Sequence, residues 1–222
     1  MHKKTYYLLL AIVGLVGLFL FTQIKRASEI KVIRNPMPLI SGATLPIPAS
    51  ESEQIYGNQG APITITEFMD LGCAKCLAFH SAIKNFVSKN PLKIRLIWKD
   101  AIQPKILAPD STLAHQAAFC AGTKGVPSGQ DKFWEFTDLA ATDKNNLSEN
   151  GLKKIAETLK LDTTKWWQCA NSPETQEVIK SSTQMANQLG IKYLPAIFAN
   201  NKLINTDAEI NIVEMLEEFT RE

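Results

Sequence analysis

Hydrophobic and polar residues alternate along two short stretches of the chain, residues 63–68 and 93–98. Alternation with a period of two is typical of a β-strand that buries one face. Between them, residues 77–89 carry apolar side chains at helical spacing, and Pro91 ends this segment. The pattern therefore predicts a strand, an amphipathic helix and a second strand.

A long helical block is predicted to follow, because no strand pattern occurs from residue 101 to residue 189. Helical patterns occur instead near residues 112–121, 132–141, 149–160 and 164–169. A fifth helix is predicted to begin after the capping residue Ser172, with Pro173 in its first turn, and to end at Gly190.

The C-terminal part returns to strand. Residues 196–199 and 202–205 predict two short strands joined by an Asn-Asn turn. Thr206, followed three residues later by Glu209, fits a capping box at the start of a final helix. The whole order is β-α-β, a helical block, then β-β-α. It favours an α/β fold with a helical insertion at about residues 101–189 over two sequential domains.

The N-terminus is uncharged over a length that suits a membrane. No charged residue lies between Lys4 and Lys25, and about 20 apolar residues suffice to span a bilayer. Because no small-x-small cleavage site follows, we predict an uncleaved transmembrane anchor over residues 1–24, with a cleaved signal peptide as the alternative. Residues 25–54 contain several prolines and predict a linker, so the folded domain is expected over residues 55–222.

Composition adds few constraints. The chain has 222 residues, 45% hydrophobic and 21% charged, which suits one globular core. A net charge of +2 gives no reason to expect a nucleic-acid partner, and three histidines are too few for a histidine-rich metal site. The function must therefore be sought in individual motifs.

Cys73-Ala74-Lys75-Cys76 lies after the first predicted strand and opens the first helix. Two cysteines at this spacing can close a reversible disulfide, and a helix N-terminus generally lowers the pKa of a thiol. The order strand, CxxC, helix is typical of thioredoxin-like redox motifs. A structural zinc half-site or an inert disulfide is the alternative. His80 shares a helix face with both cysteines, so copper or zinc binding stays open beside a packing or surface role.

From about residue 55 to its end, the chain resembles the DsbA-like thiol–disulfide oxidoreductases. The matching segments occur in the family's order and comprise residues 66–76 with Phe79-His80, residues 132–136 and residues 190–198. The resemblance implies an α/β, thioredoxin-like fold with an inserted all-helical subdomain. It also implies thiol–disulfide exchange without a cofactor or a bound metal.

The resemblance gives roles to the residues around the motif. Cys73 is implied as the nucleophile and Cys76 as the more buried resolving thiol. Lys75 is a cation that would favour the Cys73 thiolate, unless it is simply solvated on an exposed turn. Glu67 is expected beneath the motif, where its carboxylate could accept a proton from Cys76, with a solvent-facing glutamate as the alternative.

Two further features follow from the same resemblance. Leu194 and Pro195 match the family's cis-proline loop, which packs against the CxxC motif and offers backbone groups and an apolar surface to an extended substrate. Some relatives have a second disulfide in the insertion, which implies a structural bond between Cys120 and Cys169. Two buried free thiols are the alternative.

We therefore predict a thiol oxidase held in the cell membrane by one span, with its catalytic domain on the extracytoplasmic (periplasmic) side. Its expected partners are reduced exported proteins and a membrane redox protein of the DsbB or vitamin-K-epoxide-reductase type, and a monomer is expected. A disulfide reductase or isomerase kept reduced by a membrane partner is the enzymatic alternative. A thioredoxin-like copper chaperone or a holdase is the non-enzymatic one.

Overall fold

The computed structural model describes residues 7, 14, 16, 44–49, 53–103, 110–122, 131–204, 206 and 211–221. The chain divides into two units, residues 1–38 and residues 39–222, and every element below belongs to the second. The predicted anchor, residues 1–24, lies outside the described residues except at positions 7, 14 and 16. Among the residues described, none of the helices has both the length and the apolar character needed to cross a bilayer.

A five-stranded sheet forms the centre of the second unit. Its strands are β1 (Gln54–Gly57), β2 (Ile63–Met69), β3 (Ile94–Asp100), β4 (Ala196–Ala199) and β5 (Lys202–Ile204). They lie in the order β1-β3-β2-β4-β5. β2 runs parallel to β3 and antiparallel to β4, so the strand that leads into the CxxC motif is central and paired on both sides.

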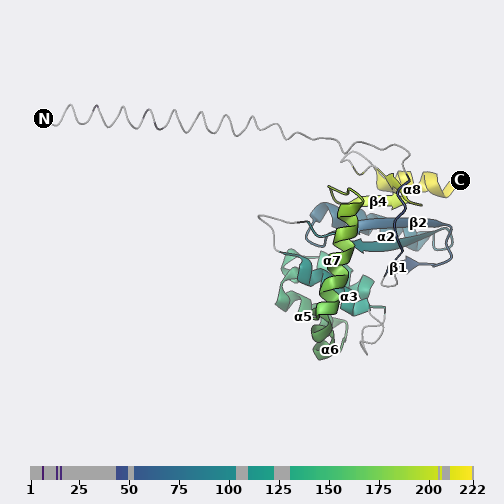
Figure 1. Cartoon of the computed structure of the whole chain (residues 1–222). Coiled ribbons are helices and arrows are strands. Elements are labelled where there is room, and N and C mark those ends of the chain that lie inside the picture. Colours follow the sequence, from purple (N-terminus) through teal and green to yellow (C-terminus); the bar gives the residue numbers. More distant parts are fainter. Residues whose placement is uncertain are drawn as a thin grey trace. The chain divides into compact units, whose positions relative to one another are not determined.

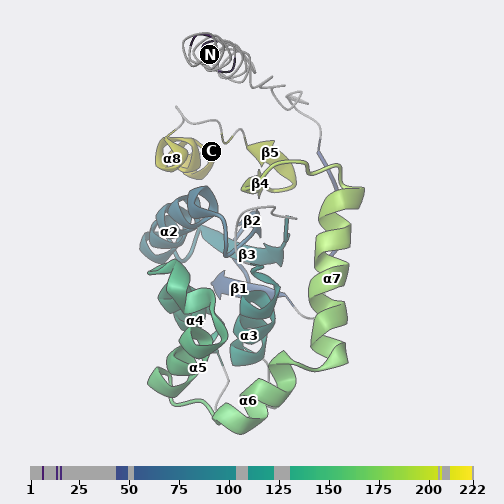
Figure 2. The same cartoon turned by 90° about the vertical axis from the view of Figure 1, so that its left-hand side faces the viewer.

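Helices cover both faces of this sheet, as Figures 1 and 2 show. On one face α2 (Ala74–Lys89) and α8 (Ile212–Arg221) bury an aliphatic core that includes Ile65 and Ile83. On the other face α7 (Pro173–Gln188) packs over Phe68 and Phe198. Alternate residues of β2 therefore point to opposite layers, as its pleat requires.

The remaining helices form the predicted insertion. They are α3 (Thr112–Gly122), α4 (Phe133–Ala141), α5 (Glu149–Thr158) and α6 (Thr163–Ala170), with a short 3-10 helix at Lys144–Leu147. Their shared core contains the fully buried Trp166, whose Nε1 donates to the carbonyl of Ala117 at 2.9 Å. The fifth predicted helix, α7, packs on the sheet as well as on α3 and α6, so it connects the insertion to the sheet.

Two details differ from the sequence-based predictions, and a third stays untested. β1 was not predicted, because its four residues are only partly buried and lack a clear alternation. Part of the predicted linker packs on the domain: Thr44 bridges to Lys202, and Leu45 and Ile47 contact the core beneath α7. Of the predicted capping box, Glu209 lies outside the described residues.

Candidate active site

The CxxC motif begins α2, and Cys73 is its capping residue. Cys73 has an extended backbone conformation, and its Sγ accepts the N–H of Cys76 at 3.2 Å. Its own N–H donates to the carbonyl of Asp70 at 2.9 Å, which closes a turn between β2 and α2. The sulfur of Cys73 therefore lies where the unpaired N–H groups of the helix start can stabilise a thiolate.

The two motif cysteines form a disulfide and differ in exposure. Their Cα atoms are 5.2 Å apart. Cys73 is half-buried, whereas Cys76, one turn deeper, is 0% exposed. An attacking thiolate can therefore reach the sulfur of Cys73 more readily than that of Cys76.

The loop before β4 contains a cis-proline. The Leu194–Pro195 peptide bond is cis, as the resemblance implied. Pro195 is followed by Ala196, which pairs with Phe68 of β2. Leu194 and Cys73 are both partly buried and pack against the large core cluster that includes Cys76. The neighbouring Tyr193 is 54% exposed and was not singled out by the sequence analysis.

Glu67 and His80 form a buried pair that joins β2 to α2. Glu67 is 0% exposed and His80 is 3% exposed, so a solvent-facing Glu67 is excluded. Nδ1 of His80 and Oε1 of Glu67 are hydrogen-bonded to each other. The ring of His80 stacks on Trp134 at 5.8 Å between centroids and meets Trp98 edge-on at 5.1 Å. His80 is thus a packed histidine, one of the roles that the sequence left open, but its carboxylate partner was not predicted.

A second buried histidine holds the loop before Cys73. Nδ1 of His115, on α3, lies 2.6 Å from Oδ1 of Asp100. The N–H of Leu71 approaches Nε2 of His115 at 3.0 Å, and Oδ1 of Asp70 lies 3.7 Å from that nitrogen. Asp70 also accepts the hydroxyl of Ser111 at 2.6 Å. The first helix of the insertion is thereby bonded to the turn that carries the motif.

The charges and hydrogen bonds of this cluster shift the pKa values of His115 and Asp70. Burial by itself would lower the pKa of His115, but hydrogen bonds and the charges of Asp100 and Asp70 raise it to about 9. Burial by itself would raise the pKa of Asp70, but hydrogen bonds from His115 and Ser111 lower it well below its usual range. Nε2 of the charged ring faces Asp70, whereas the neutral ring accepts from Leu71. Loss of the proton from Nε2 of His115 therefore replaces its interaction with Asp70 by the hydrogen bond from Leu71.

Sequence reasoning missed this cluster for a physical reason. A histidine at position 115, between Ala114 and Ala117, indicates a buried helix face that must supply a polar partner. The partners come from the C-terminal ends of β2 and β3. Which strand ends lie against α3 depends on tertiary packing, which a sequence pattern does not show. The only indication in the sequence was a single histidine on a helix face that was expected to be buried.

The other predicted residues lie around or away from the motif. Lys75 is exposed, and its Nζ lies 5.7 Å from the ring centroid of Phe79 on the surface of α2. Cys120 and Cys169 form a disulfide that joins α3 to α6, with Cα atoms 5.9 Å apart. Within the described ranges, no three His, Cys, Asp or Glu side chains are grouped so as to hold a metal ion.

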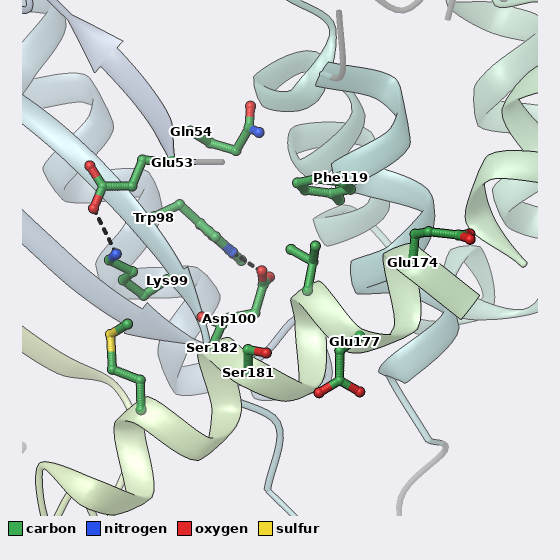
Figure 3. Close-up of a pocket in the computed structure, with 12 residues that line it drawn as sticks. Glu53, Gln54, Trp98, Lys99, Asp100, Phe119, Glu174, Glu177, Ser181 and Ser182 are labelled. Atoms are coloured by element: carbon green, nitrogen blue, oxygen red, sulfur yellow. Dashed lines mark hydrogen bonds and ion pairs between the residues drawn. The ribbon is translucent and has the colours of Figure 1, made fainter. Parts of the chain in front are cut away.

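A hollow of about 390 Å³ lies between β3 and α7, away from the motif (Figure 3). Lys99 on its wall pairs with Glu53 at 2.7 Å, and Nε1 of Trp98 donates to Asp100 at 2.8 Å. Neither motif cysteine lines it. Because Asp100 does line it, the hollow gives solvent a route to one carboxylate partner of His115.

A central β2, a helix that begins with CxxC and a cis-proline directly before β4 together define a thioredoxin-fold protein. A family model described as Thioredoxin matches residues 49–217, and the chain therefore belongs to this family. Among curated proteins, the chain is 23% identical over 171 residues to the Probable disulfide bond formation protein D of Bacillus anthracis. That match covers 72% of this chain and 75% of the relative.

Solved structures share the fold. The thiol-disulfide exchange protein alpha-DsbA2 from Wolbachia pipientis has a TM-score of 0.64 at 19% identity, covering 77% of this chain and 87% of that one. Oxidised BdbD from Bacillus subtilis has a TM-score of 0.63 at 18% identity, covering 79% and 96%. A different relative, the Na(+)/H(+) antiporter NhaA 3 of Salinispora tropica, is 22% identical over 68% of this chain, but the match spans 22% of the antiporter.

The resemblance to DsbA-like proteins is confirmed, and the chain is a thiol–disulfide oxidoreductase, as predicted. The thioredoxin-like α/β fold with added helices is confirmed as well.

Proposed function

We propose that this protein is a thiol oxidase that transfers its Cys73–Cys76 disulfide to exported proteins. The observation that carries the proposal is the unequal exposure of the two sulfurs at a helix start. Cys73 is half-buried and caps α2, while Cys76 is fully buried one turn deeper. A substrate thiolate attacks Sγ of Cys73, the electron pair of the broken S–S bond passes to Cys76, and a second substrate thiolate then displaces Cys73.

The surroundings support a substrate that is an extended polypeptide. Leu194 and Pro195 would form one wall of its binding surface, with the exposed ring of Tyr193 beside them. A membrane anchor over residues 1–24 and a linker from residue 25 would hold the domain, residues 55–222, on the extracytoplasmic side. A membrane redox partner of the DsbB or vitamin-K-epoxide-reductase type would restore the disulfide.

The full-length protein, purified in detergent, tests the assignment. It should oxidise a reduced dithiol peptide, and Cys73→Ser should abolish that reaction. The double variant Cys120→Ser with Cys169→Ser is the matched control, because it removes the other disulfide and should retain exchange. Full activity of Cys73→Ser would refute the assignment.

The direction of electron flow needs a separate measurement. A reduction potential of the Cys73–Cys76 pair near about −120 mV is typical of a strong thiol oxidase, whereas about −270 mV is typical of a thioredoxin-like reductase. We expect the oxidising value. The thioredoxin-like value would favour the reductase or isomerase alternative.

A further inference from the structure

Gln103 follows β3 and is hydrogen-bonded to two separate parts of the candidate site. Its backbone N–H donates to Oδ2 of Asp70 at 3.3 Å. Its side-chain Nε2 donates to the carbonyl of Lys192 at 3.0 Å, across 89 positions of sequence. One residue therefore bridges the turn before the CxxC motif and the loop before the cis-proline.

The Asp70 end of this bridge is fixed relative to the motif. The carbonyl of Asp70 accepts the N–H of Cys73 at 2.9 Å, so the turn that carries the reactive sulfur and the carboxylate that holds Gln103 belong to one bonded unit. The N–H of Ala101 donates to the carbonyl of Met69 at 2.9 Å, which extends the pairing of β2 and β3 towards Gln103. The backbone of Gln103 therefore has a defined position beside the turn.

The Lys192 end of the bridge lies in the segment that joins α7 to β4 (Figure 2). Hydrogen bonds hold the backbone of this segment at two places. The carbonyl of Lys192 accepts from Gln103, and the carbonyl of Pro195 accepts the hydroxyl of Thr206 at 3.1 Å. Residues 193–194 lie between these two places, so the Gln103 bond limits how far they can move.

The two residues between these places present an apolar surface. Tyr193 is 54% exposed, and Leu194 is partly buried against the core cluster that contains Cys76. An exposed tyrosine ring offers a large apolar area to a partner while its hydroxyl stays in water. A small thiol needs to reach only the sulfur of Cys73. An extended polypeptide advances about 3.3 Å per residue and can also contact the ring.

We infer that Gln103 is a positioning residue that holds Tyr193 and Leu194 for a polypeptide substrate with an apolar side chain beside its cysteine. This inference rests on the proposed thiol–disulfide exchange and names the class of substrate for that site. Gln103 acts through the backbone of Lys192 and takes no part in the sulfur chemistry. Without its Nε2 the segment gains conformational freedom, which a bound polypeptide must then remove at a cost in affinity.

A neighbouring bond separates this role from a general contribution to stability. The N–H of Ile102 donates to Oγ1 of Thr183 at 3.2 Å, which ties the same stretch of chain to α7 rather than to the loop. The bond from Gln103 to Lys192 lies at an exposed position, where a neutral hydrogen bond adds little to stability. The two bonds therefore provide matched variants, one that frees the loop and one that does not.

The test is single-turnover oxidation of two dithiol peptides by the oxidised full-length protein in detergent. The peptides differ only in phenylalanine or serine beside the first cysteine, and dithiothreitol serves as the small thiol. Gln103→Met keeps the length of the side chain but lacks the donor. We expect it to raise the half-saturating concentration of the phenylalanine peptide about fivefold, in the range that one hydrogen bond contributes. The maximal rate, the rate with dithiothreitol and the reduction potential should stay those of the wild type, because only binding is affected.

Three further variants make the outcome decisive. Gln103→Lys keeps an N–H donor of similar reach and should restore wild-type binding, whereas Thr183→Val should leave binding unchanged. Tyr193→Ser, at an exposed position, should abolish the preference for the phenylalanine peptide even if Gln103→Met folds poorly. Wild-type binding by Gln103→Met, an equal loss in Thr183→Val, or a preference that survives Tyr193→Ser would overturn the inference alone. A wild-type protein without Cys73-dependent exchange, with either peptide or with dithiothreitol, would overturn the proposed function itself.

Discussion

Two buried histidines contact the same tryptophan, Trp98, and differ in how fully their rings are bonded. The ring centroid of His80 lies 5.1 Å from that of Trp98, and the ring centroid of His115 lies 6.2 Å from it. Among the residues that the structure describes, His115 has carboxylate or amide partners at both nitrogens, whereas His80 has one at Nδ1 alone. A fully bonded cluster is the expected solution for a buried polar group, so removing its histidine should cost more stability than removing the less fully bonded one.

The largest effect should come from the fully bonded cluster. His115→Leu leaves Asp70 and Asp100 buried without their shared partner. Breaking a buried ion pair typically costs 3–5 kcal/mol, and we expect about 5 kcal/mol here because two carboxylates are affected. Urea unfolding followed by circular dichroism measures this loss. A loss below about 1 kcal/mol would show that His115 does not hold the turn before Cys73.

A smaller loss should follow the matched change at the other histidine. His80→Leu removes one hydrogen bond and leaves Glu67 buried, while the new side chain still packs between Trp98 and Trp134. We expect a loss of about 2 kcal/mol in the free energy of unfolding. Equal losses in His80→Leu and His115→Leu would contradict the distinction between the two clusters, and the same urea titration decides it.

The smallest expected effect is a gradual change of the free energy of unfolding with pH. His115 has a pKa of about 9 in the folded protein, against about 6.5 in an unfolded chain. Its contribution is therefore fully present below about pH 6.5 and is lost as the pH rises towards 9. Between pH 7 and pH 9 the free energy of unfolding should fall by about 1 kcal/mol per pH unit. The slope should be absent in His115→Leu, and a wild-type stability that rises over this range would contradict the assignment.

The same comparison shows what the sequence could predict. Elements with a strong local pattern were predicted nearly to the residue: α3 was expected over 112–121 and spans Thr112–Gly122, and β4 was expected and found over 196–199. The reason is that periodicity and capping residues are local properties. β1 lacked such a pattern, because its pairing with β3 depends on a partner some forty residues away.

The residues of the candidate site also fall into two groups, those that the sequence predicts and those that it does not. The motif Cys73–Cys76 and the loop at Pro195 are recognisable in the sequence, because the chemistry requires those residue types at fixed places. The partners of His80 and His115 are not, since each hydrogen bond joins elements whose contact exists only after the sheet and helices pack. Glu67 was predicted beneath the motif, but its pairing with His80 was not.

The pairing of β4 with β2 has a consequence for how the protein is made. Phe68 pairs with Ala196, so the central strand receives its second neighbour from a segment near the end of the chain. Contacts between such distant segments form late, because closing a long loop carries a large entropic cost. A chain emerging from its N-terminus presents Cys73 and Cys76 long before β4 has been made. The central strand therefore stays without its second neighbour until the segment that carries Pro195 has been synthesised.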